Sequence, residues 1–344
     1  MSKAAIIIVN WNGKHLLKDC FDSLRKQSYR EFQVYLVDNN SSDASIEFTK
    51  KNYSEIKIIK LNDNYGFAKG NNEGIKVALN DPNIKYIITL NNDTIVDKNW
   101  LKNLVAASEL HPKIGACASK TLYLEKKDTI NSNGIAIYQD GHAISWRGFE
   151  KASEYKKIEE IFAPSAVAAL YKRVALEKVG LFDDSFFMYH EEVDLAWRLR
   201  YGGYASIYVP DAIVYHAHSA TSKPFSPLKA YYSERNRIWV VFKNFTWSMI
   251  LKSFGYTIKR YYNLAKELKN KRGPVAEFTK KQPLSKAILI LLKAWFIGTI
   301  TLPKFIPQRI KIQKMRKDNK VTNKKIDNWF KRFGVNVKRL AMTK

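Results

Sequence analysis

The chain has 344 residues, 46% of them hydrophobic, which is enough for two domains or one large domain with an extension, and for an ample buried core. Its two cysteines, Cys20 and Cys117, lie far apart, which excludes a disulfide framework or cysteine metal site and predicts core thiols in a reducing compartment. The formal net charge of +26 is unevenly placed, because residues 1–222 carry 28 Lys and Arg against 27 Asp and Glu, whereas residues 223–344 carry 30 against 5. The basic surplus therefore belongs to a separate module, suited to an anionic surface such as phospholipid headgroups or nucleic acid.

The first 120 residues alternate short β-rich runs with helical segments, which predicts a mainly parallel sheet with helices on both faces. The apolar stretch after Met1–Lys3 is too short for a signal peptide, so we expect a cytoplasmic chain. Asp97 is a predicted helix N-cap. The expected strands are Ala4–Val9, Gln33–Val37, Ile56–Leu61, Tyr86–Leu90 and Ile114–Ala118, and the expected helices are His15–Lys26, Ser45–Asn52, Ala68–Leu79 and Lys98–Glu109.

From about residue 129 to 219 the pattern changes to shorter strands and hairpins, as expected for an extension of the sheet. One helix is predicted and is closed by Gly202-Gly203. The expected elements are strands at Thr129–Tyr138, Ala143–Arg147, Ile161–Tyr171 and Ala205–Val209, and a helix at Glu191–Tyr201.

Lys223-Pro224-Phe225-Ser226-Pro227 breaks this pattern and marks the predicted boundary of a basic helical region. Within that region the apolar residues from Trp247 to Leu268 recur at three- and four-residue steps, flanked by lysines. Such a stripe either lies on a membrane surface or packs against the neighbouring domain. The apolar segment 287–302 is shorter than the roughly 20 residues of a spanning helix and is predicted to be interfacial or buried.

Acidic or amide side chains follow several of the predicted strands, at the sheet edge where ligands of open α/β folds bind. The sequence has no GxGxxG turn after its first strand and no Walker lysine motif, which disfavours hydride transfer and P-loop chemistry. Turn formation and helix capping are the alternative explanation for each cluster alone. The clusters are Asn10 and Asn12, Asp38–Ser41, Asn62–Gly66 and Asn91–Thr94.

Taken together and in order, these motifs resemble the inverting nucleotide-sugar transferases of glycosyltransferase family 2, most of all its rhamnosyltransferase-like branch. The resemblance covers residues 4 to about 240 and implies a GT-A fold: a Rossmann-like, mainly parallel sheet with helices on both faces. With the boundary at Lys223, we expect a catalytic domain over 1–222, with a nucleotide-sugar half to about 120 and an acceptor half from 121. The charge and the apolar stripe of residues 223–344 predict a basic helical membrane-associating region. The motifs are Val9–Gly13, Val37–Asp43, Asn64–Ala68 with Gly70–Asn72, Leu90–Thr94, and Gly180–Asp183 with Phe186–Asp194.

The resemblance also implies the donor site. Asp38 would bind the nucleotide base or ribose, and Asp93 would hold a divalent cation, Mg²⁺ or Mn²⁺, against the diphosphate. At the position of the family's first metal-binding carboxylate this chain has Asn91, so Asp93 is the one charged ligand that remains. We therefore expect weak binding of the metal ion in the absence of the donor diphosphate. His216 is a second implied metal or diphosphate ligand, whereas His218 is read as structural. The other implied nucleotide-binding residues are Asn10, Asn12, Asn40, Asn64, Gly66, Asn72 and Asn92.

An inverting transferase needs a carboxylate to take the proton of the attacking hydroxyl. Glu191, Glu192 and Asp194 are the candidates, and helical spacing puts the first and last on one face. The resemblance maps the base to Glu192, while an exposed acidic helix start is the structural alternative. Arg235 is predicted either to contact phosphate or to form a salt bridge.

These features predict a metal-assisted inverting glycosyltransferase that acts on a hydroxyl of a lipid-linked or cell-surface glycan at the inner face of the cell membrane. The favoured donor is dTDP-rhamnose, with UDP-galactofuranose, UDP-galactose and UDP-N-acetylglucosamine as alternatives. A basic nucleic-acid-binding protein is a remote alternative that leaves the acidic motifs unexplained, so no nucleic-acid partner is expected. A nucleotidyltransferase would require a basic Gly-rich phosphate loop, which the sequence lacks.

Overall fold

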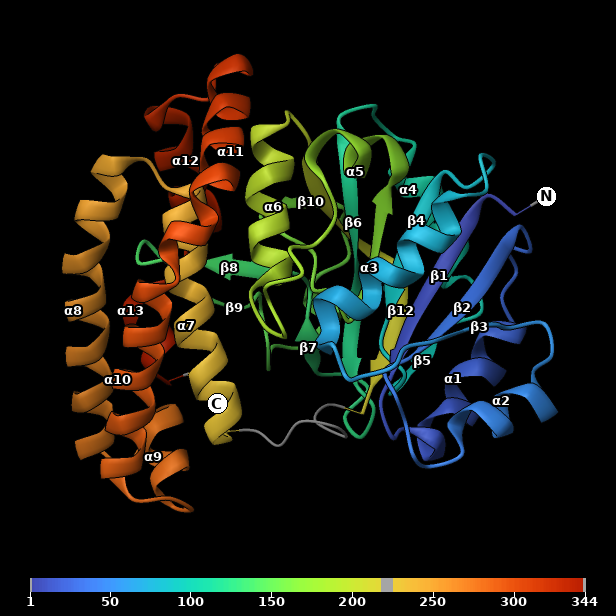
Figure 1. Ribbon diagram of the computed structural model, residues 1–344, viewed down its shortest axis with the longest axis horizontal. Coiled ribbons are helices and arrows are strands. Elements are labelled where there is room, and N and C mark those ends of the chain that lie inside the picture. Colours follow the sequence, from blue (N-terminus) through green and yellow to red (C-terminus); the bar gives the residue numbers. More distant parts are fainter. Residues whose placement is uncertain (1, 218–224, 343–344) are drawn as a thin grey trace. The chain divides into compact units, whose positions relative to one another are not determined.

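The computed structural model describes residues 2–217 and 225–342, which fold into two compact units (Figure 1). The first unit comprises Met1–Ile135 and Ser145–Thr221, and the second comprises Ala136–Ile144 and Ser222–Lys344. The short segment Ala136–Ile144 therefore groups with the C-terminal helices and not with the sequence around it. His218 and the boundary residues Lys223 and Pro224 lie outside the described residues.

The first unit is built around one mixed sheet with the strand order β10-β12-β6-β11-β4-β1-β2-β3. Strands β4, β1, β2 and β3 run parallel, as predicted, and their register sets Asn10 at the end of β1 opposite Asp38 at the end of β2. The strands are β1 (Ala4–Asn10), β2 (Phe32–Asp38), β3 (Lys57–Lys60), β4 (Tyr86–Leu90), β5 (Thr94–Val96), β6 (Ile114–Tyr123), β7 (Ile130–Ser132), β10 (Glu159–Ile161), β11 (Ala168–Lys172) and β12 (Ala205–His216).

Helices cover both faces of this sheet, as predicted, because successive residues of a strand point to opposite sides. Ile6 and Ile8 of β1 share a core cluster with Leu17 of α1, whereas Ile7 lies so close to Gly74 of α3 that a Cβ there would sit 2.5 Å from its Cγ2. The helices are α1 (Lys14–Arg25), α2 (Ser45–Asn52), α3 (Gly66–Leu79), α4 (Trp100–Ser108), α5 (Arg173–Val179) and α6 (Glu191–Tyr201).

Several predicted elements of the first unit differ from the observed ones. The strand predicted over Ile161–Tyr171 is two strands, β10 and β11, and the one predicted over Thr129–Tyr138 is broken at Gly134, whose φ of +135° does not continue a strand. Strand β12 does not stop at Val209 but continues to His216 after a register shift, as expected where a proline interrupts the ladder. Helix α4 starts at Trp100 and its N-cap position is Asn99, so Asp97 is not its N-cap.

Both cysteines are core thiols, as predicted. Cys20 on α1 and Cys117 on β6 are fully buried and unpaired, and burial raises the pKa of the Cys20 thiol to about 12. Neither thiol is therefore a nucleophile at neutral pH.

The second unit is mainly helical. Its hairpin β8 (Ile135–Ile137) and β9 (Ala143–Ser145) crosses the boundary of the units, and Ile137 pairs with Gly334 near the C-terminus. The N-cap side chains of Ser226 and Thr246 start two of the helices by accepting hydrogen bonds from Lys229 N and Met249 N. The helices are α7 (Pro227–Asn244), α8 (Trp247–Lys269), α9 (Gly273–Thr279), α10 (Leu284–Ile300), α11 (Ile306–Asp318), α12 (Asn323–Phe333) and α13 (Val337–Met342).

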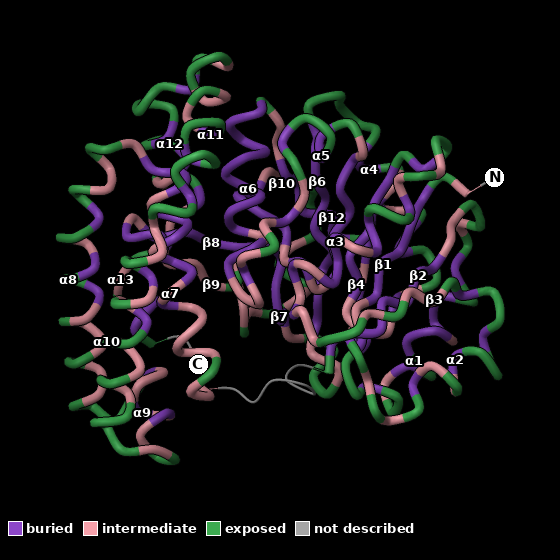
Figure 2. Tube along the Cα trace, viewed as in Figure 1, coloured by how far each residue is buried: buried purple, intermediate pink, exposed green. Residues whose placement is uncertain are grey.

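Helices α8 and α10 of the second unit expose much of their surface (Figure 2). The segment predicted as interfacial or buried forms α10, whose buried residues are the small Ala294 and Gly298. Within the described residues, no single helix meets the length and hydropathy expected of a membrane span; α9 and α10 meet them only as a pair, bent by 120° at the break between them.

Candidate active site

The carboxyl ends of β1, β2 and β4 meet at one edge of the sheet in a chain of hydrogen bonds. The Asn92 amide donates to Asn10 Oδ1 over 2.8 Å, Asn10 Nδ2 lies 3.2 Å from Ser41 Oγ, and Ser41 N donates to Asp38 Oδ2 over 2.9 Å. Asn10 and Asp38 are fully buried. Gly13 allows the arrangement, because a Cβ there would lie 2.4 Å from the Asn92 amide. The structure thus brings together three of the predicted nucleotide-binding residues: Asn10, Asp38 and Asn92.

Asn12 and Asn40 lie on the exposed loops that border this edge. Both adopt positive φ angles, 51° and 62°, a conformation that asparagine tolerates better than most residues. Asn12 Oδ1 accepts a hydrogen bond from Ser42 N over 2.8 Å, and Asn12 N donates to Ser41 Oγ over 3.0 Å. The two loops therefore brace each other beside Asp38.

Asn64 and Gly66 shape the start of α3. Gly66 N donates to Asn64 Oδ1 over 3.0 Å, and Gly66 has a φ of +77°. A Cβ at Gly66 would lie 2.2 Å from the carbonyl oxygen of Phe187, so only glycine permits this approach to the segment that leads into α6. The loop is thereby tied to the segment that carries the acidic cluster.

Asn72, which we predicted at the nucleotide, has a structural task instead. Its Nδ2 donates to Phe182 O over 2.8 Å and to Asp184 Oδ1 over 2.5 Å, and its Oδ1 accepts from Phe182 N over 3.2 Å. Because both its amide atoms are used and the residue is buried, the Asn72 side chain supports the loop before α6, and this corrects the prediction that it contacts the nucleotide.

Asp93 and His216 come together from two distant parts of the chain. His216 Nε2 lies 3.1 Å from Asp93 Oδ1, and Ala217 N donates to Asp93 O over 3.0 Å. Strand β12 brings them together because it pairs with β5, with His216 opposite Thr94. Asn91 lies two residues before Asp93 in the same turn, where its carbonyl oxygen accepts from Thr94 Oγ1.

Asp93 and His216 fit a divalent cation. Two ligands at right angles around an ion with bonds of about 2.1 Å are about 3 Å apart, close to the observed 3.1 Å. The residues that the structure describes contain no group of three or more His, Cys, Asp or Glu side chains that could hold a metal.

The acidic cluster at the start of α6 is not an exposed helix start. Glu191 is 5% exposed, Asp194 is fully buried, and Glu192 is half-buried. Burial, followed by the neighbouring Glu192 carboxylate, raises the pKa of Glu191 well above its usual range, and burial raises the pKa of Glu192 to about 7. Among the described residues, neither Glu191 Oε2 nor Glu192 Oε2 has a hydrogen-bond partner.

Asp194, the third candidate base, is held in an ion pair. Its Oδ2 accepts from Arg198 Nε over 2.9 Å, and the same guanidinium donates to the carbonyl oxygens of Val179, Gly180 and Leu181. Asp194 therefore orients Arg198 and the loop before α6, and its ion pair argues against a role as the base.

A cavity of about 520 Å³ opens beside His216. Tyr123 and Phe149 line it, with their rings stacked at a centroid distance of 5.5 Å. Glu125, Lys126 and Thr129 add polar groups to its wall. The cavity thus offers an aromatic surface and hydrogen-bonding groups next to the proposed metal ligand.

Arg235 lies in the second unit, on α7. Its Nε and Nη2 lie 2.9 and 2.8 Å from Asn236 Oδ1, and its guanidinium carbon lies 4.0 Å from the ring centre of Trp239. Burial lowers the pKa of Arg235. These contacts fix the side chain within α7, and its predicted phosphate contact stays a prediction.

Two residues of this site were missed in the sequence. Asn131 Oδ1 lies 3.2 Å from His216 Nδ1, and Ser41 Oγ joins Asn10 to the backbone of Asn12. Ser41 belongs to the Asp38–Ser41 cluster, so its place after β2 is a usable signal. Asn131 lies in a short strand of the acceptor half, and nothing in its sequence context marks it.

The comparisons with known proteins bear on the family and the fold. The family model of glycosyl transferase family 2 matches residues 5–180, so the chain belongs to that family. The central sheet and its helices form the GT-A fold expected of it.

Two curated relatives and one solved structure show the range of similar proteins. The chain is 25% identical over 212 residues, 61% of this chain and 48% of the relative, to a poly-beta-1,6-N-acetyl-D-glucosamine synthase of Staphylococcus epidermidis. It is 26% identical over 249 residues, 66% of this chain and 80% of the relative, to an N-acetylglucosaminyl-diphospho-decaprenol L-rhamnosyltransferase of Mycobacterium tuberculosis. The chain spans about half the length of the first of these relatives.

The solved structure is a mannosyltransferase from Pyrobaculum calidifontis in complex with GDP-Man and Mn²⁺. Its superposition on this chain has a TM-score of 0.55 at 14% sequence identity and covers 93% of this chain and 87% of the mannosyltransferase. At this identity the likeness concerns the fold alone.

Proposed function

We propose that this chain is an inverting glycosyltransferase that moves a sugar from a nucleotide sugar to a hydroxyl of a glycan or lipid-linked glycan. The observation that carries the proposal is the single sheet edge at which the Asp38–Ser41–Asn10–Asn92 chain meets the Asp93–His216 pair. Ligands of open α/β folds bind at such an edge. The amide and carboxylate groups of this edge can bond the nucleotide's base or ribose. The neighbouring Asp93–His216 pair suits a diphosphate with its cation.

The donor that we favour is dTDP-rhamnose. The mycobacterial relative is named an L-rhamnosyltransferase and aligns over 80% of its own length, which supports this choice. The staphylococcal relative is named a poly-N-acetylglucosamine synthase, so UDP-N-acetylglucosamine stays an alternative, as do UDP-galactose and UDP-galactofuranose.

Glu192 is the base in this proposal. It takes the proton of the acceptor hydroxyl as that oxygen forms the new bond to the anomeric carbon and the nucleoside diphosphate departs from the opposite side. A pKa of about 7 suits the task, because a base is most effective when its pKa lies near the working pH. Glu191, which burial and its neighbour keep protonated to higher pH, is the alternative.

Asp93 and His216 would hold the divalent cation, Mg²⁺ or Mn²⁺. When bound, the cation neutralises the charge that develops on the departing diphosphate. Asn131 fixes the imidazole through Nδ1 and leaves Nε2 toward Asp93. With one carboxylate in the set, we expect the cation to bind together with the donor diphosphate. The solved mannosyltransferase structure contains Mn²⁺, which supports a cation of this class.

The acceptor, in this proposal, places a sugar ring in the cavity lined by Tyr123 and Phe149. Aromatic faces and a few polar groups are typical of sites that bind amphipathic small molecules. The cavity borders His216, so a ring there would lie next to the donor diphosphate.

A thermal-shift screen of nucleoside diphosphates and nucleotide sugars, each with and without Mn²⁺, tests the proposal, because a ligand of the native state raises its stability. We expect dTDP or UDP to raise Tm, and more so with Mn²⁺. No response to any nucleotide, with RNA binding instead, would favour the nucleic-acid-binding alternative. Release of free diphosphate in place of a nucleoside diphosphate would favour a nucleotidyltransferase.

A further inference from the structure

Helix α8 of the second unit turns its apolar side outward. Trp247, Leu251, Phe254, Ile258 and Tyr262 recur at three- and four-residue steps and are between 51% and 75% exposed. Four of these residues, all but Tyr262, belong to the stripe predicted from the sequence. A soluble helix normally buries such a stripe against its neighbours, so its exposure requires an explanation.

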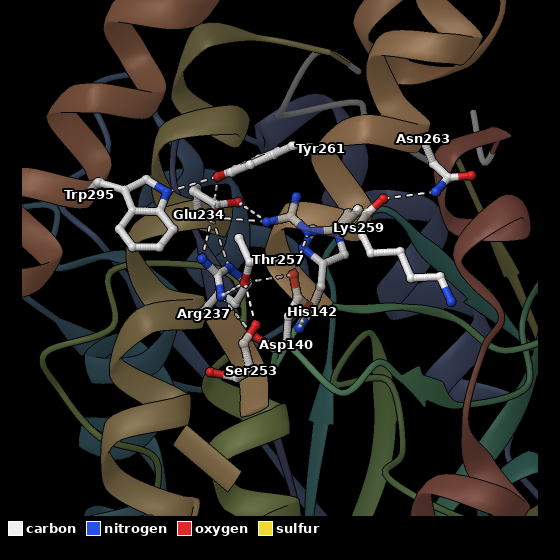
Figure 3. Close-up of polar contacts among 11 residues, drawn as sticks. Asp140, His142, Glu234, Arg237, Ser253, Thr257, Lys259, Tyr261, Asn263 and Trp295 are labelled. Carbon is white, nitrogen blue, oxygen red and sulfur yellow. Dashed lines mark hydrogen bonds and ion pairs between the residues drawn. The ribbon is translucent and has the colours of Figure 1, made fainter. Parts of the chain in front are cut away.

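The polar side of the same helix faces inward and is held there by buried ion pairs (Figure 3). The buried residues of α8 are Ser253, Thr257 and Arg260. Arg260 donates from Nε to Asp140 Oδ2 over 2.6 Å and from Nη2 to Glu234 Oε2 over 2.9 Å. All of these residues belong to the second unit.

Rotating α8 to bury its apolar stripe would break these bonds and leave the Asp140 and Glu234 carboxylates without Arg260. The outward direction of the stripe is therefore built into the fold of this unit.

Helix α10 carries a second exposed apolar stripe. Ile288, Leu289, Leu292, Phe296 and Ile300 are between 50% and 65% exposed. The two buried residues of α10 are small, Ala294 and Gly298, and a Cβ on Gly298 would lie 2.9 Å from Ile238 of α7. The two helices are joined where Trp295 Nε1 donates to Tyr261 OH over 2.8 Å.

Basic side chains border both stripes. Lys252, Lys259 and Lys266 follow α8 at seven-residue steps and are exposed, and Lys293 is exposed on α10. In Figure 3 the ammonium group of Lys259 extends away from the buried ion pairs. Residues 223–344 carry 30 Lys and Arg against 5 Asp and Glu. A second copy would bring the same positive charge to this face, whereas an anionic lipid surface complements both the charge and the apolar side chains.

We propose that the exposed stripes of α8 and α10, here called the docking face, insert into the headgroup region of an anionic phospholipid bilayer. The large apolar side chains enter the boundary between headgroups and acyl chains, and the lysines contact lipid phosphates. This assigns the protein to the inner surface of the cell membrane as a peripheral protein. The proposal goes beyond sugar transfer and does not depend on it, because binding to lipid needs neither donor nor acceptor.

Vesicle sedimentation of the full chain tests the proposal with two lipid compositions, phosphatidylcholine alone and phosphatidylcholine with phosphatidylglycerol. We expect binding to the anionic vesicles that falls when salt is raised from about 0.1 M to about 0.5 M. Leu251→Glu/Ile258→Glu should lower the partition coefficient at least about tenfold. Leu110→Glu/Val174→Glu is the matched control, since it places the same charges on exposed apolar positions of the first unit and should change binding less than about twofold.

Three results would overturn the proposal. The first is equal loss of vesicle binding in the stripe variant and the control, with both folded by circular dichroism. The second is a concentration-dependent dimer that the stripe variant abolishes, with no vesicle binding by the wild type. The third is salt-sensitive binding to RNA without binding to either vesicle. A failure of nucleotide binding would leave all of these readouts unchanged, so the two proposals fail separately.

Discussion

His216 Nε2 lies 3.1 Å from Asp93 Oδ1, and on its other side His216 Nδ1 lies 3.2 Å from Asn131 Oδ1. The imidazole is thus held between a carboxylate that follows β4 and an amide on β7. A histidine that bonds an oxygen through Nδ1 directs Nε2 toward a metal, and the bond fixes both tautomer and ring orientation. The pair Asp93–His216 therefore has its orienting residue in place.

Asn131→Ala should weaken metal-dependent donor binding, because it removes the hydrogen-bond acceptor that orients His216. In the proposed site Asn131 itself contacts neither the donor nor the cation. Loss of such a partner typically costs about 10- to 100-fold in metal affinity. Calorimetric titration of dTDP or UDP in the presence of Mn²⁺ measures the effect, and the same titration without Mn²⁺ is the control. A similar loss with and without Mn²⁺ would mean that Asn131 supports the nucleotide site generally and not the cation.

Part of the donor site could be predicted because it follows from strand order. Asn10, Asp38 and Asn92 come directly after or at the end of strands, and parallel strands end at a common edge. Asn72 also lies in one of the motifs that carry the resemblance, but its amide is used by Phe182 and Asp184, residues distant in the sequence. The spacing of residues in the sequence cannot tell an amide that faces the donor site from one that bonds the backbone elsewhere, because residues distant in the sequence decide which of the two occurs.

The orientation of α8 shows a second limit of sequence reasoning. Periodicity identified its apolar stripe, but which side is buried depends on Asp140 and Glu234, which lie on a hairpin and on another helix. The ion pairs of these carboxylates with Arg260 keep the polar side of α8 buried, although an amphipathic helix ordinarily buries its apolar side. No pattern within α8 alone contains that information.

Glu192→Gln should abolish sugar transfer and leave donor binding intact, because the amide keeps the shape of the side chain but cannot take a proton. Glu192→Asp should retain part of the activity, since it keeps the carboxylate and shortens the side chain by one methylene. Product formation under single-turnover conditions, with nucleotide affinity measured in parallel, checks both. If Glu191→Gln abolished transfer while Glu192→Gln did not, the base would be Glu191.

The pH dependence of transfer should follow the same carboxylate. Burial raises the pKa of Glu192 to about 7, and the base must be deprotonated to act, so kcat should rise about tenfold per pH unit below 7 and level off above it. A profile of kcat from pH 5 to 9 with saturating donor measures this. A rise centred near 4.5, the ordinary value of a glutamate, would contradict the burial of the working base.

Stability should change with pH in the opposite direction. Between pH 4.5 and about 7 the folded protein keeps on Glu192 a proton that the unfolded chain releases, so the free energy of unfolding falls as pH rises through this window. Glu192→Gln removes the effect and should raise the free energy of unfolding, and with it Tm, more at pH 8 than at pH 5. The difference between the two free-energy gains is at most roughly 3 kcal/mol. Melting curves of the two proteins at both pH values test this, and an equal shift at both would argue against a raised pKa.

Glu234→Gln should strongly destabilise the second unit. Burial alone would raise the pKa of Glu234, but the charges of Arg237 and Arg260 hold it well below its ordinary value. Glutamine keeps the size of the side chain and leaves two buried guanidinium groups with one carboxylate fewer, a change that typically costs about 3–5 kcal/mol. Urea unfolding followed by circular dichroism measures the loss, and Glu277→Gln, on a half-buried residue of α9, is a control that should change stability by less than about 1 kcal/mol. Because Glu234 also holds Arg260, the variant should loosen α8 and weaken binding to anionic vesicles, whereas Glu277→Gln should leave that binding unchanged.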